Sequence, residues 1–156
     1  MDLISSTAMN ITKLAMDGLM ARQSAIASNT ANVETPDYQR KEVQFEDQLK
    51  DIISRENKKD ELKSFFCARF EPTSLEQIRP TKADLDFLQS NSYEGYAPQT
   101  KIDTRIASPY NGNNVTLERE MMDMAKVTTQ FQALSTLEAR MMSQIKDVIA
   151  GGGTNG

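Results

Sequence analysis

The sequence predicts a mainly α-helical protein. Two long terminal helices are expected to pack as a coiled-coil hairpin, with a small, loop-rich middle lobe containing short strands. Three observations predict this fold class. Apolar residues recur every three or four positions at both ends of the 156-residue chain, the period of one helical face. The C-terminal pattern continues for longer than about 25 residues, which is typical of a coiled coil. Polar sequence interrupted by prolines separates the two ends.

The composition argues against catalytic chemistry. Hydrophobic residues make up 38% of the chain, below the roughly 45–50% that compact domains reach when glycine is counted. The chain has no histidine and one cysteine, so the commonest general base and the usual set of zinc ligands are missing. Glycine-rich phosphate-binding motifs are also missing from the sequence. We therefore expect no enzyme activity, no cofactor, no metal and no small-molecule substrate.

Charge and hydropathy limit the partners and the location. The formal net charge is −4, from 18 basic and 22 acidic residues that are mixed along the chain. Nucleic-acid binding needs clustered lysines and arginines, so we expect no nucleic-acid partner. Residues 1–21 lack the basic leader of a secretory signal, and no stretch approaches the roughly 20 apolar residues of a membrane span. The sequence predicts a soluble protein that would leave the cytosol without a cleaved signal peptide.

The first region, residues 1–35, is predicted to be one helix. Pro36 is expected to end it, because the residue before a proline favours extended geometry. The apolar stripe changes from large to small side chains along the helix, and small side chains let another backbone approach closely. Gly18→Leu or Ala25→Leu is therefore expected to block assembly and to leave the monomer soluble. The alternative is an amphipathic helix packed on its own core. The stripe that we expect to pack consists of Ile4, Ala8, Ile11, Leu14, Gly18, Ala21 and Ala25.

The second region, residues 36–114, is predicted to be extended at first and then loop-rich. Val43 and Phe45 alternate as in a strand, after which the pattern becomes helical. The stretch 61–70, ELKSFFCARF, is expected to form a short strand. One or two helical turns are expected at 83–89.

The third region, residues 115–150, is predicted to be a second long helix, followed by a flexible tail at 151–156. No glycine or proline interrupts Leu117–Ala150, so the helix should extend for about 50 Å at about 1.5 Å per residue. Asn114 or Thr116 could cap its start, and Glu120 suits the positive end of the helix dipole. The expected packing residues are Leu117, Met121, Met124, Phe131, Leu134, Met141, Ile145 and Val148.

Helices of this length have more apolar surface than one short chain can cover. Neighbouring copies can cover the remainder, and a head-to-tail contact that does not close on itself generates a helical filament or tube.

Two segments resemble motifs of the bacterial flagellar rod and hook family. Residues 22–49, RQSAIASNTANVETPDYQRKEVQFEDQL, contain a run similar to the family's N-x-A-N-x-x-T-P-G-Y. Residues 111–149, NGNNVTLEREMMDMAKVTTQFQALSTLEARMMSQIKDVI, resemble the matching C-terminal motif. With its short chain, the sequence is most similar to the proximal basal-body rod proteins that start the rod. Asp37 replaces the usual glycine, so we expect a type I turn or a local Asx turn. The motif residues are Asn29, Asn32, Thr35, Pro36 and Tyr38.

The resemblance implies a structural subunit of the hollow drive shaft that transmits torque and carries the export channel. It implies type III export and a place in the basal body, spanning the periplasm. The implied partners are copies of the chain, other rod subunits, the inner-membrane ring, its rod adaptor and the export gate. Another flagellar axial subunit, or a self-contained soluble helical adaptor or chaperone, is the alternative.

The resemblance also implies roles for the motif residues. If the terminal helices form the inner wall of a tube, Asn29 and Asn32 can donate to carbonyls within or between subunits. The alternative is that both asparagines cap their own helix. Tyr38 and Arg40 would fix the exit of the extended segment, and simple core packing is the alternative for Tyr38.

Overall fold

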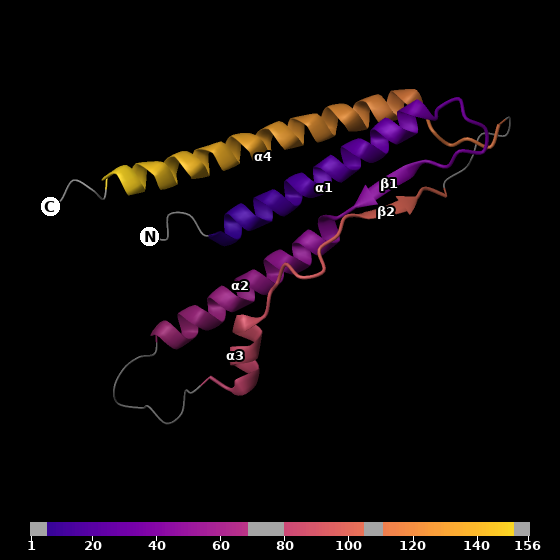
Figure 1. Ribbon diagram of the computed structural model, residues 1–156. Helices are drawn as coiled ribbons and strands as arrows, with labels where there is room; N and C mark the ends of the chain where they lie inside the picture. Colours follow the sequence, from indigo (N-terminus) through magenta and orange to yellow (C-terminus); the bar gives the residue numbers. More distant parts are fainter. Residues whose placement is uncertain (1–5, 69–79, 105–110, 152–156) are drawn as a thin grey trace. The chain divides into compact units, whose positions relative to one another are not determined.

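The computed structural model describes residues 6–68, 80–104 and 111–151 (Figure 1). It confirms the predicted fold class, with two long terminal helices packed together and a small two-stranded sheet. The elements in the described residues are α1 (Ser6–Ala31), β1 (Lys41–Gln44), α2 (Glu46–Ala68), α3 (Lys82–Gln89), β2 (Gln99–Ile102) and α4 (Leu117–Gly151).

The chain divides into two compact units. One comprises Met1–Glu46 with Ala97–Gly156, and the other is Asp47–Tyr96. The first unit contains α1, β1, β2 and α4, and the second contains α3 and nearly all of α2. Each unit is described by itself below.

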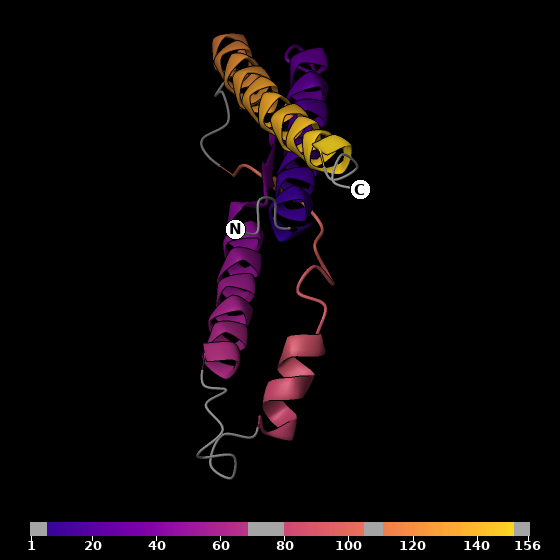
Figure 2. The same ribbon diagram turned by 90° about the vertical axis from the view of Figure 1, so that its left-hand side faces the viewer.

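Helices α1 and α4 form an antiparallel pair in the first unit, lying side by side in Figures 1 and 2. The end of α1 meets the start of α4, where Asn29 contacts Glu120. Helix α1 has 26 residues and α4 has 35. The buried apolar residues of this unit are Leu19, Ala25, Ile26, Val43, Phe45, Val127 and Met141.

The predicted boundary of the first helix differs from the structure. Helix α1 ends at Ala31 rather than at Thr35, and hydrogen-bonded turns follow it. The Asn32 amide donates to the Ser28 carbonyl at 2.8 Å, which satisfies one acceptor of the last helical turn. Side-chain capping, rather than the proline ring, accounts for this helix end. The predicted start of the second long helix at Leu117 agrees with α4.

The small sheet lies beside α1 in the first unit. Strands β1 and β2 pair antiparallel, with Lys41 opposite Ile102 and Gln44 opposite Gln99. The alternation at Val43 and Phe45 therefore corresponds to a strand that leads directly into α2, as the sequence predicts. Val43 and Phe45 are buried on the inner side of this segment.

The short strand expected at 61–70 is wrong. Helix α2 continues to Ala68, and residues 69 and 70 lie outside the described residues. Leu62, Phe65 and Phe66 recur at helical spacing, and Lys63 pairs with Asp60 one turn earlier at 3.3 Å. The cluster of aromatic residues suggested a strand, but the surrounding charges continue the helical period.

The second unit contains the helical turns expected at 83–89, which correspond to α3. Thr81 caps this helix, with Asp84 completing a capping box. Lys59 of α2 is buried, lies 3.3 Å from Glu56 and donates to the Ser90 carbonyl after α3. A buried lysine requires such partners, and here they connect the two helices of the unit.

Candidate functional site

The candidate site is the hairpin formed by α1 and α4, with a polar cluster closing one end. We call this cluster the polar clasp. It comprises Asn29, Arg40, Asp103, Asn113, Asn114, Glu120 and Asp123.

Asn29 joins the end of α1 to both β1 and α4. Its side chain is fully buried. Its Oδ1 accepts from the Lys41 backbone N–H at 2.8 Å, and its Nδ2 donates to the Lys41 carbonyl at 2.8 Å. The same Nδ2 donates to Glu120 Oε2 at 3.0 Å. Asn29 therefore pairs with one residue of β1 as a neighbouring strand would, and it does so within a single chain.

Arg40 and Glu120 form the charged centre of the clasp. Both are buried, and Arg40 Nε donates to Glu120 Oε1 at 2.5 Å. The other guanidinium nitrogens lie 2.8 Å from Asp123 Oδ2 and 3.5 Å from Asp103 Oδ2. Burial by itself would lower the pKa of Arg40, but the hydrogen bond and charge of Glu120, together with the charges of Asp123 and Glu42, raise this pKa above its ordinary value. The guanidinium group therefore keeps its charge inside the fold.

Two consecutive asparagines before α4 complete the clasp. The buried Asn113 Nδ2 lies 2.9 Å from the carbonyl oxygens of Asn32, Val33 and Thr35, which follow α1. Its neighbour Asn114 accepts from the Arg40 backbone N–H at 2.6 Å. These amides satisfy backbone groups at the end of α1 and along the extended segment. They connect those segments to the start of α4.

The family glycine position has a left-handed backbone in this chain. Asp37 has a φ of +58°, so the type I turn expected there is wrong. Its N–H donates to the Asn111 carbonyl at 2.8 Å, which contributes to holding this conformation. Gly112 also has a positive φ, and a Cβ added to it would lie 2.2 Å from Asp37 Oδ1. Asp37 therefore adopts the left-handed backbone geometry that a glycine would adopt more easily. Its side chain packs so closely against Gly112 that a larger residue at position 112 would clash with it.

The residues of the N-terminal motif differ in their burial and in their hydrogen-bond partners. Asn29 is an internal connector, whereas Asn32 caps its own helix through the Ser28 carbonyl. Thr35 and Pro36 are exposed. Tyr38 is half-buried, with its hydroxyl 3.1 Å from Ser28 Oγ and 3.3 Å from Asn29 Oδ1.

The predicted packing residues of α1 are only partly brought together. Gly18 and Ala25 are buried, and Ala8 is exposed. A Cβ added to Gly18 would lie 2.5 Å from the Phe45 ring of the same chain. Leucine at Gly18 or Ala25 would therefore disturb the single chain, and neither substitution isolates packing between subunits. The half-buried members are Ile11, Leu14 and Ala21, and Ile4 lies outside the described residues.

The predicted packing residues of α4 are more exposed. Met141 is buried, but Met121 is 65% exposed and Val148 is 58% exposed, and Leu117 is also exposed. Another residue beside Val148, Ile149, is 73% exposed. The half-buried members are Met124, Phe131, Leu134 and Ile145.

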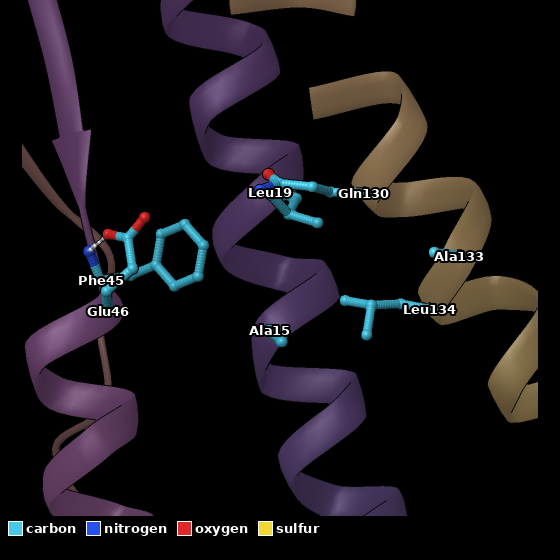
Figure 3. A pocket seen from close by; sticks show the side chains of 7 residues that line it. All are labelled: Ala15, Leu19, Phe45, Glu46, Gln130, Ala133 and Leu134. Atoms are coloured by element: carbon cyan, nitrogen blue, oxygen red, sulfur yellow. Dashed lines mark hydrogen bonds between the residues drawn. The ribbon is translucent and has the colours of Figure 1, made fainter. Parts of the chain in front are cut away.

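A shallow groove of about 340 Å³ lies between α1 and α4, beside the Phe45 ring (Figure 3). Leu134 points toward α1 across it, and Leu19 and Gln130 also line it (Figure 3). Two of the lining residues contact Arg22, whose Cζ lies 4.8 Å from the Phe45 ring centroid and whose Nη2 lies 2.5 Å from Glu46 Oε1. The lining is Ala15, Leu19, Phe45, Glu46, Gln130, Ala133 and Leu134.

The described residues offer neither a metal site nor a membrane span. Residues 6–68, 80–104 and 111–151 contain no group of three or more acidic, cysteine or histidine side chains placed to hold a metal ion. Across the same described ranges, no helix combines the length and the apolar character needed to cross a membrane. The carboxylates of the clasp face arginines instead.

Sequence reasoning did not identify the clasp. It assigned Glu120 to the helix dipole and Arg40 to the exit of the extended segment. One signal was available: Glu120 lies three residues after Leu117 and four before Met124, on the apolar face of α4. An acid on a buried face needs a partner.

Known proteins resemble this chain along most of its length. The flagellar basal body rod protein FlgB of Bacillus subtilis is 29% identical over 152 residues, covering 97% of this chain and 99% of the relative. Proteins of the same name from Borreliella burgdorferi and Borrelia hermsii are 25% and 27% identical over 134 residues, covering 86% of this chain and 89% of each relative.

None of the established protein-family models matches the chain. The named relatives nevertheless agree with one another, and the match to the Bacillus subtilis protein includes both terminal helices and the middle region. Along most of its length, the chain is therefore similar to flagellar basal body rod proteins.

Proposed function

We propose that this chain is a structural subunit of the proximal rod, which assembles through its terminal helices into the hollow shaft. In that role it transmits torque and surrounds the export channel. The observation that carries the proposal is the apolar surface of α4 that the single chain leaves uncovered, including Met121, Val148 and Ile149.

The energetic argument is the burial of that surface. Covering a large apolar side chain contributes about 1.5–3 kcal/mol. Several such residues are exposed along α4, and a monomeric protein rarely exposes a large contiguous apolar patch without a partner for it. Copies of the chain and other rod subunits are the partners that we propose for this surface. A rod subunit acts through such contacts, which agrees with the absence of an enzyme name among the relatives.

We propose the remaining partners and the location from the resemblance to flagellar rod proteins. We place the subunit in the basal body, spanning the periplasm, after type III export without a cleaved signal peptide. The inner-membrane ring, its rod adaptor and the export gate are the proposed neighbours at the base of the shaft. The relatives' names, flagellar basal body rod protein, support the basal body itself.

The test uses the exposed end of α4. Val148→Lys with Ile149→Lys should abolish swimming and the recovery of complete rods. The free energy of unfolding of the dilute chain should remain within about 0.5 kcal/mol of the parent, since both side chains are exposed. Gln144→Lys, on the same helix and also exposed, is the matched charge control and should assemble normally. Normal swimming of the double variant would remove this surface from the assembly interface.

A further inference from the structure

We propose that Asn111 and Gly112 form a self-modifying site in the folded chain. The Asn111 side-chain amide would be lost spontaneously, which converts the residue into aspartate or isoaspartate. The co-reactant is water, and the proposal requires no enzyme or cofactor. The site lies in the turn that precedes α4 and contacts the residues following α1.

Three features of this turn favour the reaction. Asn111 is exposed, so water reaches its side chain. Gly112 has no side chain to shield its backbone nitrogen, which is the attacking atom. The Asn113 N–H donates to Asn111 Oδ1 at 3.2 Å. Negative charge develops on that oxygen when the side-chain carbon is attacked, so this donor stabilises the tetrahedral intermediate.

The chemistry balances without an oxidant or a reductant. The Gly112 nitrogen bonds to Asn111 Cγ and loses its proton, while the Cγ–Nδ2 bond breaks and ammonia leaves. The resulting five-membered imide then adds water at one of its two carbonyls. Opening on one side restores the normal backbone with an aspartate. Opening on the other side leaves isoaspartate, in which the side-chain carbon has entered the backbone.

The product alters contacts that hold the end of the hairpin. The Asn111 carbonyl accepts from the Asp37 N–H at 2.8 Å, and the Asp37 carboxylate packs directly against Gly112. Either product places a second negative charge near Asp37. Isoaspartate also lengthens the backbone next to Asn113, whose amide holds three carbonyls after α1. The modification should therefore loosen the polar clasp.

Other asparagines of the described residues provide an internal comparison. Asn29, Asn32 and Asn114 are followed by β-branched residues, and their amides are hydrogen-bonded. Asn91 is exposed but is followed by serine, whose side chain hinders attack by the backbone nitrogen. Asn91 is thus the matched reference for an exposed asparagine that lacks a following glycine.

The experiment incubates the folded full-length chain in mildly alkaline buffer and follows both positions by peptide mass spectrometry. Isoaspartate is identified by enzymatic methyl labelling. We expect Asn111 to convert at least about tenfold faster than Asn91, because Gly112 has no side chain to hinder attack by its backbone nitrogen whereas Ser92 has one. Both asparagines accept a hydrogen bond from the backbone N–H two residues later, so this contact does not distinguish them. A folded chain in which Asn111 stays intact, while the urea-unfolded chain converts it, would overturn the proposal.

A second measurement tests the consequence with a variant that cannot follow the same route readily. Asn111→Gln lengthens the side chain, which makes the five-membered ring inaccessible. Aged parent protein should show faster amide hydrogen exchange at residues 29–35 than fresh protein, and aged Asn111→Gln should match its own fresh sample. Equal exchange in modified and fresh parent protein would show that the clasp is not loosened and would overturn that part of the proposal.

Discussion

The two ends of the α1–α4 hairpin are built from different interactions. At the closed end, buried polar side chains from the end of α1, from Arg40 before β1, from Asp103 after β2 and from the start of α4 contact one another within one chain. One buried atom, Arg40 Nη1, lies 3.5 Å from Asp103 Oδ2 but has no hydrogen-bond partner. At the far end, which comprises residues 6–17 of α1 and 134–151 of α4, large apolar side chains such as Leu137, Met142 and Val148 remain exposed. The polar groups of the closed end meet within a single subunit, although Met121 and Met122 on the same part of α4 are exposed. The far end has exposed apolar surface as well, which is left for a partner.

Because of this difference, one chain is held in place at the closed end and leaves apolar surface for a partner elsewhere. Buried hydrogen-bonded charges tolerate little displacement, because a lost partner leaves a charge without compensation. The clasp therefore sets the register between α1 and α4. Apolar contacts are less directional, so the far end can be covered by whichever neighbour presents a matching surface.

The largest expected effect comes from breaking the charged centre. Arg40→Ala leaves Glu120 buried without its cation, which should lower the free energy of unfolding by about 3–5 kcal/mol. Urea denaturation measures this change. Arg140→Ala, an exposed arginine of the same helix pair, is the control and should change stability by less than about 0.5 kcal/mol.

A double variant tests whether the loss of stability in Arg40→Ala comes from the unpaired charge of Glu120. Arg40→Met combined with Glu120→Leu removes both charges and should recover part of the lost stability, since an apolar pair often replaces a buried ion pair well. If Arg40→Ala lies within about 1 kcal/mol of the parent, the closed end does not depend on the clasp as described.

The next largest effect is a difference in stability loss between alanine substitutions at the two motif asparagines, Asn29 and Asn32. Asn29→Ala leaves the Lys41 N–H and carbonyl without their buried partner, which should cost about 1–3 kcal/mol. Asn32→Ala loses one hydrogen bond to the Ser28 carbonyl and should cost about 1 kcal/mol. Thermal unfolding of both variants gives the order, and a larger loss for Asn32→Ala would contradict the assignment of Asn29 as the connector.

A smaller change of opposite sign is expected at Asp37. Its left-handed backbone costs a non-glycine residue about 1–2 kcal/mol, and a glycine there gives back about 0.5–1 kcal/mol through its greater freedom when unfolded. Asp37→Gly should therefore stabilise the chain by up to about 1 kcal/mol. Asp37→Ala, which keeps the backbone strain without the carboxylate, is the control and should not stabilise. Destabilisation by glycine would mean that the carboxylate itself holds the turn.

The smallest expected effect is the pH dependence of the stability that the Arg22–Glu46 ion pair beside the groove contributes. Burial alone would raise the pKa of Glu46, but the hydrogen bond and charge of Arg22, together with hydrogen bonds from the Glu46 and Phe45 backbone, lower the pKa below its ordinary value. The pair therefore stabilises the fold above the unfolded pKa of about 4.3, and this contribution is lost as the pH falls through the lower folded value. Glu46 is 58% exposed, so the contribution should stay below about 1 kcal/mol.

The comparison of parent and Glu46→Gln tests that sign. Their urea midpoints should differ at neutral pH and converge in acid. A difference that grows as the pH falls would contradict the direction of the pKa shift.

The elements that could be predicted from the sequence are those marked by hydrophobic periodicity and by local residue propensity. The two long helices, the start of α4, the strand at Val43 and the helical turns of α3 all follow from local patterns. The end of α1 did not, because it depends on side-chain amides, including Asn113, which is far away in the sequence. The aromatic cluster of α2 was misread for a similar reason, since its strand propensity competes with a helical charge pattern that extends beyond it.

The clasp required information that no local pattern carries. Arg40 and Glu120 are separated by most of the chain, and each has an ordinary local explanation. Only their juxtaposition shows that a charge lies inside the fold. The same holds for Asp37 and Gly112, whose positive φ values and close approach depend on the meeting of two distant turns.

Amide hydrogen exchange on the dilute, monomeric chain tests the contrast between the two ends most directly, because exchange reports local opening segment by segment. The account predicts protection at residues 25–45 and 113–127, around the polar clasp, and nearly free exchange at residues 6–17 and 138–151. Equal protection at both ends would show that the hairpin is complete in one chain, as in a self-contained helical adaptor. Free exchange around the clasp itself would contradict the claim that a single chain closes that end.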